Sequence, residues 1–161
     1  MKSLVENVNL LAKELVHKCI EKQFTIVFAE SMTGGLLANL VTSVPDASKV
    51  LSESFVVYSE EAKEKILHCK KETINQYSVY SQQVIIEMIE GLKTLSNAHI
   101  LVSVSGIAGP KTYKDIDIGS VYMGIEICGK QMVFKEKFQG SRQEITYKTC
   151  EFIFKKIISN I

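Results

Sequence analysis

Short apolar runs alternate with amphipathic segments along this chain, and that order limits the folds open to it. Leucines and valines recur at helical spacing over residues 3–21, and the apolar run 24–28 that follows is short enough to be a buried strand. The same reasoning predicts helices near 34–44, 59–67 and 81–96, a last helix from about 142 with apolar positions at 154–161, and strands at 55–58, 100–105, 121–127 and 131–138.

The last two predicted strands are joined by Gly129-Lys130, which is typical of a hairpin turn. Early alternation of helices with strands, followed by a late hairpin, predicts an α/β protein with a mixed sheet covered by helices on both faces. The 161 residues show no repeat or linker, so we expect one domain, residues 1–161.

The charge balance argues against nucleic acid or a membrane surface as a partner. The chain has 19 basic and 18 acidic residues and a net charge of +1, so it presents no excess of basic residues. It shows no signal-peptide pattern and no apolar run of transmembrane length, and we therefore expect a cytoplasmic protein.

The cysteines give no sign of a disulfide framework or a metal site. They are scattered, without a CxxC pair and without histidines at ligand spacing, and we expect them to be reduced thiols. The four are Cys19, Cys69, Cys128 and Cys150.

Three polar segments that contain glycine or a helix start fall at predicted strand ends. They are Glu30–Gly35, Tyr58–Lys63 and Ser105–Pro110. In open α/β sheets the binding crevice lies at the carboxyl ends of the strands, so we expect these segments to meet in one site.

Ser31 admits two interpretations. Ser31 or Thr33 is able to cap the helix that follows. Gly34 and Gly35, however, weaken a helix start by roughly 1 kcal/mol each, a cost that is tolerated where backbone must approach a ligand closely. In that case the N–H groups of residues 33–35 point at a phosphate or an oxyanion, and Ser31 is a nucleophile.

Lys63 also admits two interpretations. Its charged surroundings are typical of a solvated helix face. If Ser59 caps this helix, however, Lys63 lies in its first turn, where the helix dipole and partial burial would lower its pKa toward that of a general base. Tyr58, at the end of the preceding strand, is either a core residue or a group that relays the proton.

The third segment and the last helix supply candidate phosphate ligands. Ser105 and Gly106 begin a loop that either cradles a phosphate through backbone donors or is a plain turn. Arg142 is either a surface residue or a clamp for a phosphate or carboxylate. No histidine follows a predicted strand, so a serine nucleophile here needs another base, and a lysine fits that need.

Six motifs, taken in order, resemble the C-terminal domain of the competence-damage-inducible protein CinA. They are AESMTGG, VVYSEEAK, SVYSQQV, SVSGIAGP, IGSVYMG and FQGSRQEI, and they extend over nearly the whole chain. The resemblance implies a three-layer α/β/α sandwich with a mixed central sheet. Single-domain members of that family are nicotinamide-nucleotide amidohydrolases.

The resemblance further implies hydrolysis of the carboxamide of nicotinamide mononucleotide to nicotinate mononucleotide and ammonia, without a metal or cofactor. Ser31 would be the nucleophile, Lys63 the base, and Tyr58 would assist proton transfer. Residues at the oxyanion or substrate end would be Thr33, Gly34 and Gly35, and those lining the nucleotide pocket would be Ser105, Gly106 and Arg142. A homo-oligomer is compatible with the family.

Two of the departures of this sequence from the family pattern bear on the activity. Glu60 replaces an asparagine, and its carboxylate would raise the pKa of Lys63. Residues 111–117, KTYKDID, replace a glycine-rich loop. Two alternatives therefore accompany the deamidase: a catalytically impaired paralogue that binds a pyridine nucleotide or a protein partner, and a hydrolase of another amide or ester.

Overall fold

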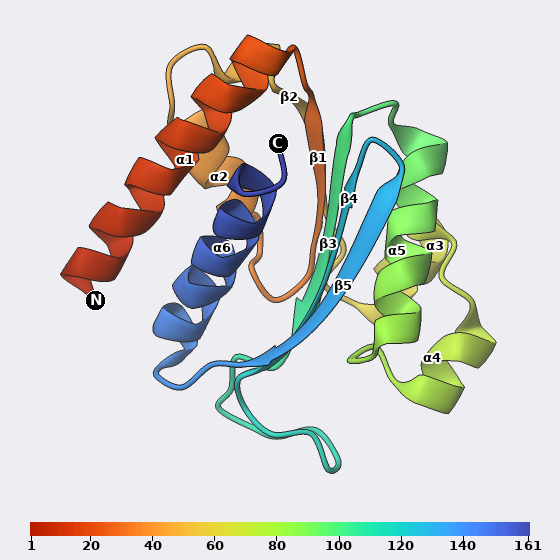
Figure 1. The fold of residues 1–161 in the computed structure, drawn as a ribbon. Coiled ribbons are helices and arrows are strands. Elements are labelled where there is room, and N and C mark those ends of the chain that lie inside the picture. The colour runs from red at the N-terminus through yellow and green to blue at the C-terminus, as the bar shows by residue number, and fades with distance from the viewer.

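A five-stranded mixed sheet in the order β2-β1-β3-β4-β5 forms the centre of the molecule (Figure 1). The computed structural model describes residues 1–161. Its strands are β1 (Ile26–Glu30), β2 (Leu51–Val56), β3 (Ile100–Gly106), β4 (Ser120–Ile127) and β5 (Lys130–Lys137). β1 pairs in parallel with β2 and β3, whereas β4 pairs antiparallel with β3 and β5. The predicted mixed sheet is confirmed.

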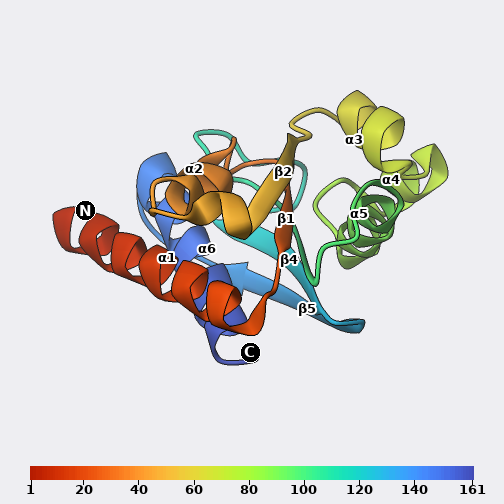
Figure 2. The same ribbon diagram turned by 90° about the horizontal axis from the view of Figure 1, so that it is seen from above.

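Helices cover both faces of this sheet (Figures 1 and 2). One layer contains α1 (Lys2–Lys22), α2 (Leu36–Thr42) and α6 (Arg142–Ile158), and the other contains α3 (Glu60–Leu67), α4 (Lys71–Tyr77) and α5 (Gln82–Leu95). A short 3-10 turn, Ala47–Lys49, precedes β2. The expected three-layer α/β/α sandwich is therefore confirmed.

Strand β1 is buried on both faces, which explains why it is a continuous apolar run. Phe28 packs in the core beneath α1, α2 and α6, whereas Val27 and Ala29 pack in the second core, beneath α3 and α5. Side chains alternate between the faces of a strand, so this pattern sends Glu30 toward α2 and Ser31 toward α3.

Two element boundaries differ from those predicted. β1 begins at Ile26 rather than residue 24, because Phe24 still donates its N–H to the Cys19 carbonyl at the end of α1. β2 covers 51–56 instead of 55–58. As an edge strand it pairs only with β1, and its partly exposed residues carry too weak an apolar pattern to locate its start.

The remaining differences are small. Helix α4 was not predicted, because Ile74 is its single buried residue and leaves no helical apolar pattern. The hairpin is confirmed, with Cys128 and Gly129 as its two loop residues, both at positive φ. None of the helices is long and apolar enough to span a membrane. No group of three or more His, Cys, Asp or Glu side chains forms a possible metal site.

Candidate active site

The chain turns sharply between β1 and α2, and the buried Glu30 carboxylate organises this turn. It accepts hydrogen bonds from the backbone N–H groups of Gly35 (3.1 Å), Leu37 (3.1 Å) and Ala38 (2.9 Å). Glu30 is fully buried, so these bonds satisfy both the carboxylate and the first turn of α2. Neither Ser31 nor Thr33 caps this helix, and the Ser31 hydroxyl is left available for another role.

The two glycines are required by the backbone of this turn. Gly34 and Gly35 have φ values of 59° and 96°, in the left-handed region that side chains disfavour. Their N–H groups are occupied, since Gly34 donates to the Ser31 carbonyl at 3.0 Å and Gly35 donates to Glu30. This differs from the expectation that N–H groups 33–35 face an anion. The N–H groups of Met32 and Thr33 have no hydrogen-bond partner in the protein.

Helix α3 places Lys63 directly behind Ser31. Ser59 caps α3 as predicted, its hydroxyl accepting the Ala62 N–H at 3.0 Å, and Lys63 follows in the first turn. Its Nζ donates to Ser31 Oγ at 3.0 Å and to the carbonyls of Val57 (2.7 Å) and Tyr58 (3.4 Å). Three acceptors thus fix the amine, and one of them is the serine hydroxyl.

Burial controls the protonation of this lysine. Lys63 is 1% exposed, and desolvation of its ammonium lowers its pKa from 10.5 to about 8. Cys69 and Glu60 act in the opposite direction, toward a higher pKa. The expected influence of Glu60 on Lys63 is confirmed in direction, but desolvation outweighs it. A lysine with a pKa near 8 has a substantial neutral fraction at physiological pH.

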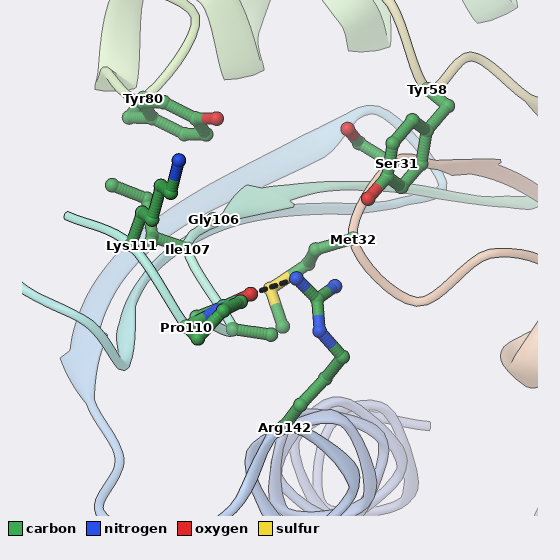
Figure 3. Close-up of a pocket in the computed structure, with 11 residues that line it drawn as sticks. Ser31, Met32, Tyr58, Tyr80, Gly106, Ile107, Pro110, Lys111 and Arg142 are labelled. Carbon is green, nitrogen blue, oxygen red and sulfur yellow. Dashed lines mark hydrogen bonds between the residues drawn. The ribbon is translucent and has the colours of Figure 1, made fainter. Parts of the chain in front are cut away.

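Ser31 opens onto a cavity of about 350 Å³ (Figure 3). Of the predicted site residues, four line it: Ser31, Tyr58, Gly106 and Arg142. Lys63 reaches this cavity through its contact with Ser31. The cavity lining does not include Thr33, Gly34, Gly35 or Ser105. The structure therefore brings the predicted catalytic group together with part of the predicted pocket.

Arg142 connects α6 to the loop after β3. It is the first residue of α6, which Ser141 and Glu144 cap reciprocally, and its guanidinium donates to the Gly109 carbonyl (Figure 3).

Gly106, at the start of the same loop, leaves no room for a side chain. A Cβ on Gly106 would lie 2.7 Å from both Met32 Sδ and the Ser120 carbonyl. Gly106 therefore serves close packing beneath the cavity.

Two buried hydroxyls near the turn have no hydrogen-bond partner. They are Thr33 Oγ1 and Ser105 Oγ. Ser105 extends from β3 on the same face as Ser103, whose hydroxyl donates to the Ile85 carbonyl of α5. Buried hydroxyls are almost always paired in folded proteins. Each of these two oxygens therefore lacks a partner within the protein, although neither residue lines the cavity.

Tyr58 contributes to the site in two ways. Its carbonyl accepts a hydrogen bond from Lys63 Nζ. The residue is 63% exposed, and its ring lines the cavity near Ser31 (Figure 3). The phenol oxygen makes no hydrogen bond within the protein. The predicted core role for this tyrosine is therefore wrong, and the ring is free to meet a ligand.

Sequence reasoning missed three contributors to this site. Glu30 was noted only as a polar strand end, and nothing in the spacing shows that its carboxylate caps α2. Tyr80 and Lys111 line the far part of the cavity. The signals in the sequence are the SVYSQQV motif, which contains Tyr80, and the divergent 111–117 loop, which contains Lys111.

Comparison with protein families gives one match across most of the chain. Residues 8–161 match the family described as the CinA C-terminal domain. A CinA-like protein from Petrotoga mobilis is 41% identical over 135 residues, which cover 83% of this chain and 34% of that protein. A putative competence-damage inducible protein from Clostridium botulinum is 38% identical over 154 residues, covering 92% and 37%. The chain thus spans about a third of the length of these relatives.

Solved structures share the whole fold. The competence damage-inducible protein A from Klebsiella pneumoniae superposes with a TM-score of 0.91 at 26% identity, covering 94% of this chain and 95% of that one. The competence/damage inducible protein CihA from Agrobacterium tumefaciens gives a TM-score of 0.91 at 27% identity, covering 95% and 94%.

Proposed function

The chain belongs to the CinA C-terminal domain family, and from that premise we propose that it is a nicotinamide mononucleotide deamidase with a serine nucleophile. One observation carries the proposal: Lys63 Nζ, whose pKa burial lowers to about 8, lies 3.0 Å from Ser31 Oγ. A serine hydroxyl is a weak nucleophile unless a neighbouring base takes its proton. No other ionisable side chain hydrogen-bonds to Ser31.

Neutral Lys63 begins the reaction by accepting the Ser31 hydroxyl proton while Oγ attacks the carboxamide carbon. The tetrahedral intermediate then collapses. The C–N bond breaks, Lys63 returns the proton to the leaving nitrogen, and ammonia departs from an acyl ester on Ser31. Lys63 next takes a proton from water, whose oxygen attacks the ester carbon. As the second tetrahedral intermediate collapses, Lys63 returns this proton to Ser31 Oγ, and the carboxylic acid product loses its own proton to solvent and leaves as the carboxylate. With a pKa near 8, about a tenth of Lys63 is neutral at pH 7.

The oxygen of the tetrahedral intermediate requires hydrogen-bond donors beside Ser31. The free N–H groups of Met32 and Thr33 follow the nucleophile directly, the position from which backbone donors serve serine hydrolases. Gly34 and Gly35 take part by shaping this turn and not through their own N–H groups. Tyr58 lines one side of the cavity, and in this proposal its phenol assists proton transfer at the leaving nitrogen.

The size and the charge of the rest of the cavity support a nucleotide as the substrate. A volume of about 350 Å³ lies at the lower end of the range of small-molecule sites. Arg142 at its edge offers the remaining N–H groups of a guanidinium to a phosphate. Ser105 directly precedes Gly106 of the cavity lining and has a hydroxyl without a partner in the protein, and we propose it as one more polar group at the substrate end.

A second candidate is a catalytically impaired paralogue that binds a pyridine nucleotide without turning it over. Glu60 raises the pKa of Lys63, and this favours the impaired paralogue, because a protonated lysine cannot serve as the base. Desolvation lowers the pKa of Lys63 by more than Glu60 raises it, so we place the deamidase first.

One experiment separates these candidates. The purified protein is incubated with nicotinamide mononucleotide, nicotinamide riboside, nicotinamide and glutamine, and released ammonia is measured along with the carboxylate product. We expect ammonia from the mononucleotide far above that from the others. Calorimetric binding of the mononucleotide without ammonia would favour the second candidate, and rapid hydrolysis of another amide would redirect the substrate assignment.

A further inference from the structure

The cavity at Ser31 has two chemically different ends (Figure 3). Ser31 and Tyr58 mark one end, where the buried lysine stands behind the serine. Tyr80 and Lys111 mark the other, and Arg142 enters from α6 between them. A ligand that spans this space therefore meets the nucleophile with one group and two cations with another.

Two cationic side chains line the cavity, and neither forms an ion pair within the protein. No aspartate or glutamate lines the cavity, whose ionisable cations are Lys111 and Arg142. The ion pairs of the structure include neither of these two residues. The Lys111 ammonium makes no hydrogen bond to protein either, whereas Arg142 uses part of its guanidinium on Gly109. Free cations facing a cavity favour an anion, and a phosphate monoester with two charges suits a pair of them.

The position of Lys111 is set by an aromatic contact. Tyr113, two residues further along the same loop, packs edge-to-face on Tyr80 with ring centroids 5.3 Å apart and planes at 69°. Tyr113 also pairs with Ile116 through two backbone hydrogen bonds, of 3.2 and 2.9 Å, which close the loop on itself. These contacts attach the loop to Tyr80, just before α5, and hold Lys111 at the cavity.

Tyr80 itself is firmly placed. It directly precedes Ser81, the N-cap of α5, and its N–H donates to Ser78 Oγ at 3.2 Å. Burial, together with the nearby Tyr113, Tyr58 and Glu60, raises the pKa of its phenol, so the hydroxyl stays protonated and able to donate at neutral pH. A rigid aromatic ring beside a free ammonium is suited to the sugar-phosphate part of a nucleotide.

From these contacts we infer that Lys111 is a specificity-determining residue that binds the substrate phosphate, and that Tyr113 positions it through Tyr80. This inference rests on the proposed function and adds to it the residue by which this chain distinguishes a phosphorylated carboxamide from the corresponding nucleoside. The divergent 111–117 loop is then the segment that supplies the phosphate ligand.

The test compares nicotinamide mononucleotide with nicotinamide riboside, which differ by the phosphate alone. Lys111→Ala should raise KM for the mononucleotide roughly tenfold to a hundredfold, the loss expected for one charge-assisted hydrogen bond, with kcat little changed. Its kcat/KM for the riboside should stay near that of the wild type. Lys130→Ala, which removes an exposed lysine from the hairpin at the opposite end of the sheet, is the matched control and should leave both substrates unaffected.

Tyr113 is tested by its conservative variant. Tyr113→Ala should raise KM for the mononucleotide in the same selective way, and Tyr113→Phe, which keeps the ring, should restore it. A thermal melt of each variant separates this effect from a loss of folding. If Lys111→Ala lowers kcat/KM equally for both substrates, or for neither, the inference is wrong although the deamidase proposal stands.

Failure of the proposed function is distinguishable from failure of this inference. If the wild type hydrolyses neither compound, calorimetry measures the affinity of the wild type and of Lys111→Ala for each. Weaker binding of the mononucleotide alone in the variant supports the phosphate role without any catalysis. Equal affinities of the two proteins for the mononucleotide would overturn it.

Discussion

Lys63 Nζ donates a hydrogen bond of 3.0 Å to Ser31 Oγ, although 32 residues separate the two in sequence. Parallel pairing of β1 with β2 brings their carboxyl ends together, and α3 then returns its first turn over the end of β1. The contact is buried, so the amine loses much of its preference for the charged state.

The rate should depend on pH through Lys63. Only the neutral amine is able to accept the Ser31 proton, so kcat/KM should rise with pH and level off above a midpoint near 8, the pKa that burial gives this lysine. A pH–rate profile on nicotinamide mononucleotide between pH 6 and 9.5 measures it. A rate independent of pH over that range would contradict the role of Lys63 as base.

Replacing Glu60 should shift this profile. Because its carboxylate raises the Lys63 pKa, Glu60→Gln should move the midpoint to lower pH and increase kcat/KM at pH 7. Glu61→Gln is the matched control, since Glu61 lies in the same first turn and does not contribute to the Lys63 pKa. A midpoint that rises in Glu60→Gln, or moves equally in both variants, would be inconsistent with this electrostatic coupling.

Much of this site could be predicted from the sequence because it depends on the order of the strands and helices along the chain. Predicted strand ends placed Ser31, Tyr58 and Ser105 at one edge of the sheet, and the Ser59 cap placed Lys63 in the first turn of α3. Parallel neighbours then meet at that edge, so the meeting of Ser31 with Lys63 required only the correct adjacency of β1 and β2.

The rest of the site depends on loop paths that periodicity does not describe. Lys111 lines the cavity on a loop whose Tyr113 packs on Tyr80, a contact between segments that are distant in sequence. Likewise, the Gly35 N–H faces Glu30 because of the tight dihedrals of the turn, which no spacing of residue types reveals. The start of edge strand β2 and the short helix α4 were missed for lack of an apolar pattern.

The free energy of unfolding should depend on pH because Lys63 is buried. The folded pKa of Lys63 is about 8 against 10.5 in the unfolded chain, so the unfolded state binds more protons between these values and stability rises with pH across them. The difference corresponds to roughly 3 kcal/mol. Urea denaturation at pH 7.5 and 10.5 should show this increase in the wild type relative to Lys63→Met. Parallel pH dependences in the two proteins would show that the lysine is not desolvated.

The turn should depend on the Glu30 carboxylate. Glu30→Gln keeps the shape but replaces one acceptor oxygen with an amide NH2 group, which donates and cannot accept the α2 N–H groups, and should lower the free energy of unfolding by roughly 1–3 kcal/mol. Because the same turn holds Ser31, kcat should fall as well. The control is Glu21→Gln, an exposed acid in α1, and an effect no larger than that of this control would show that Glu30 does not hold the turn.

Ammonia release by Ser31→Ala against the wild type is the most direct measurement of the central claim. The account predicts that release from nicotinamide mononucleotide falls by at least about a thousandfold, while calorimetric affinity for the nucleotide is kept. Ser52→Ala, which removes an exposed hydroxyl from β2, should behave as the wild type. Undiminished ammonia release by Ser31→Ala would contradict the account, because it would show that Ser31 is not the nucleophile.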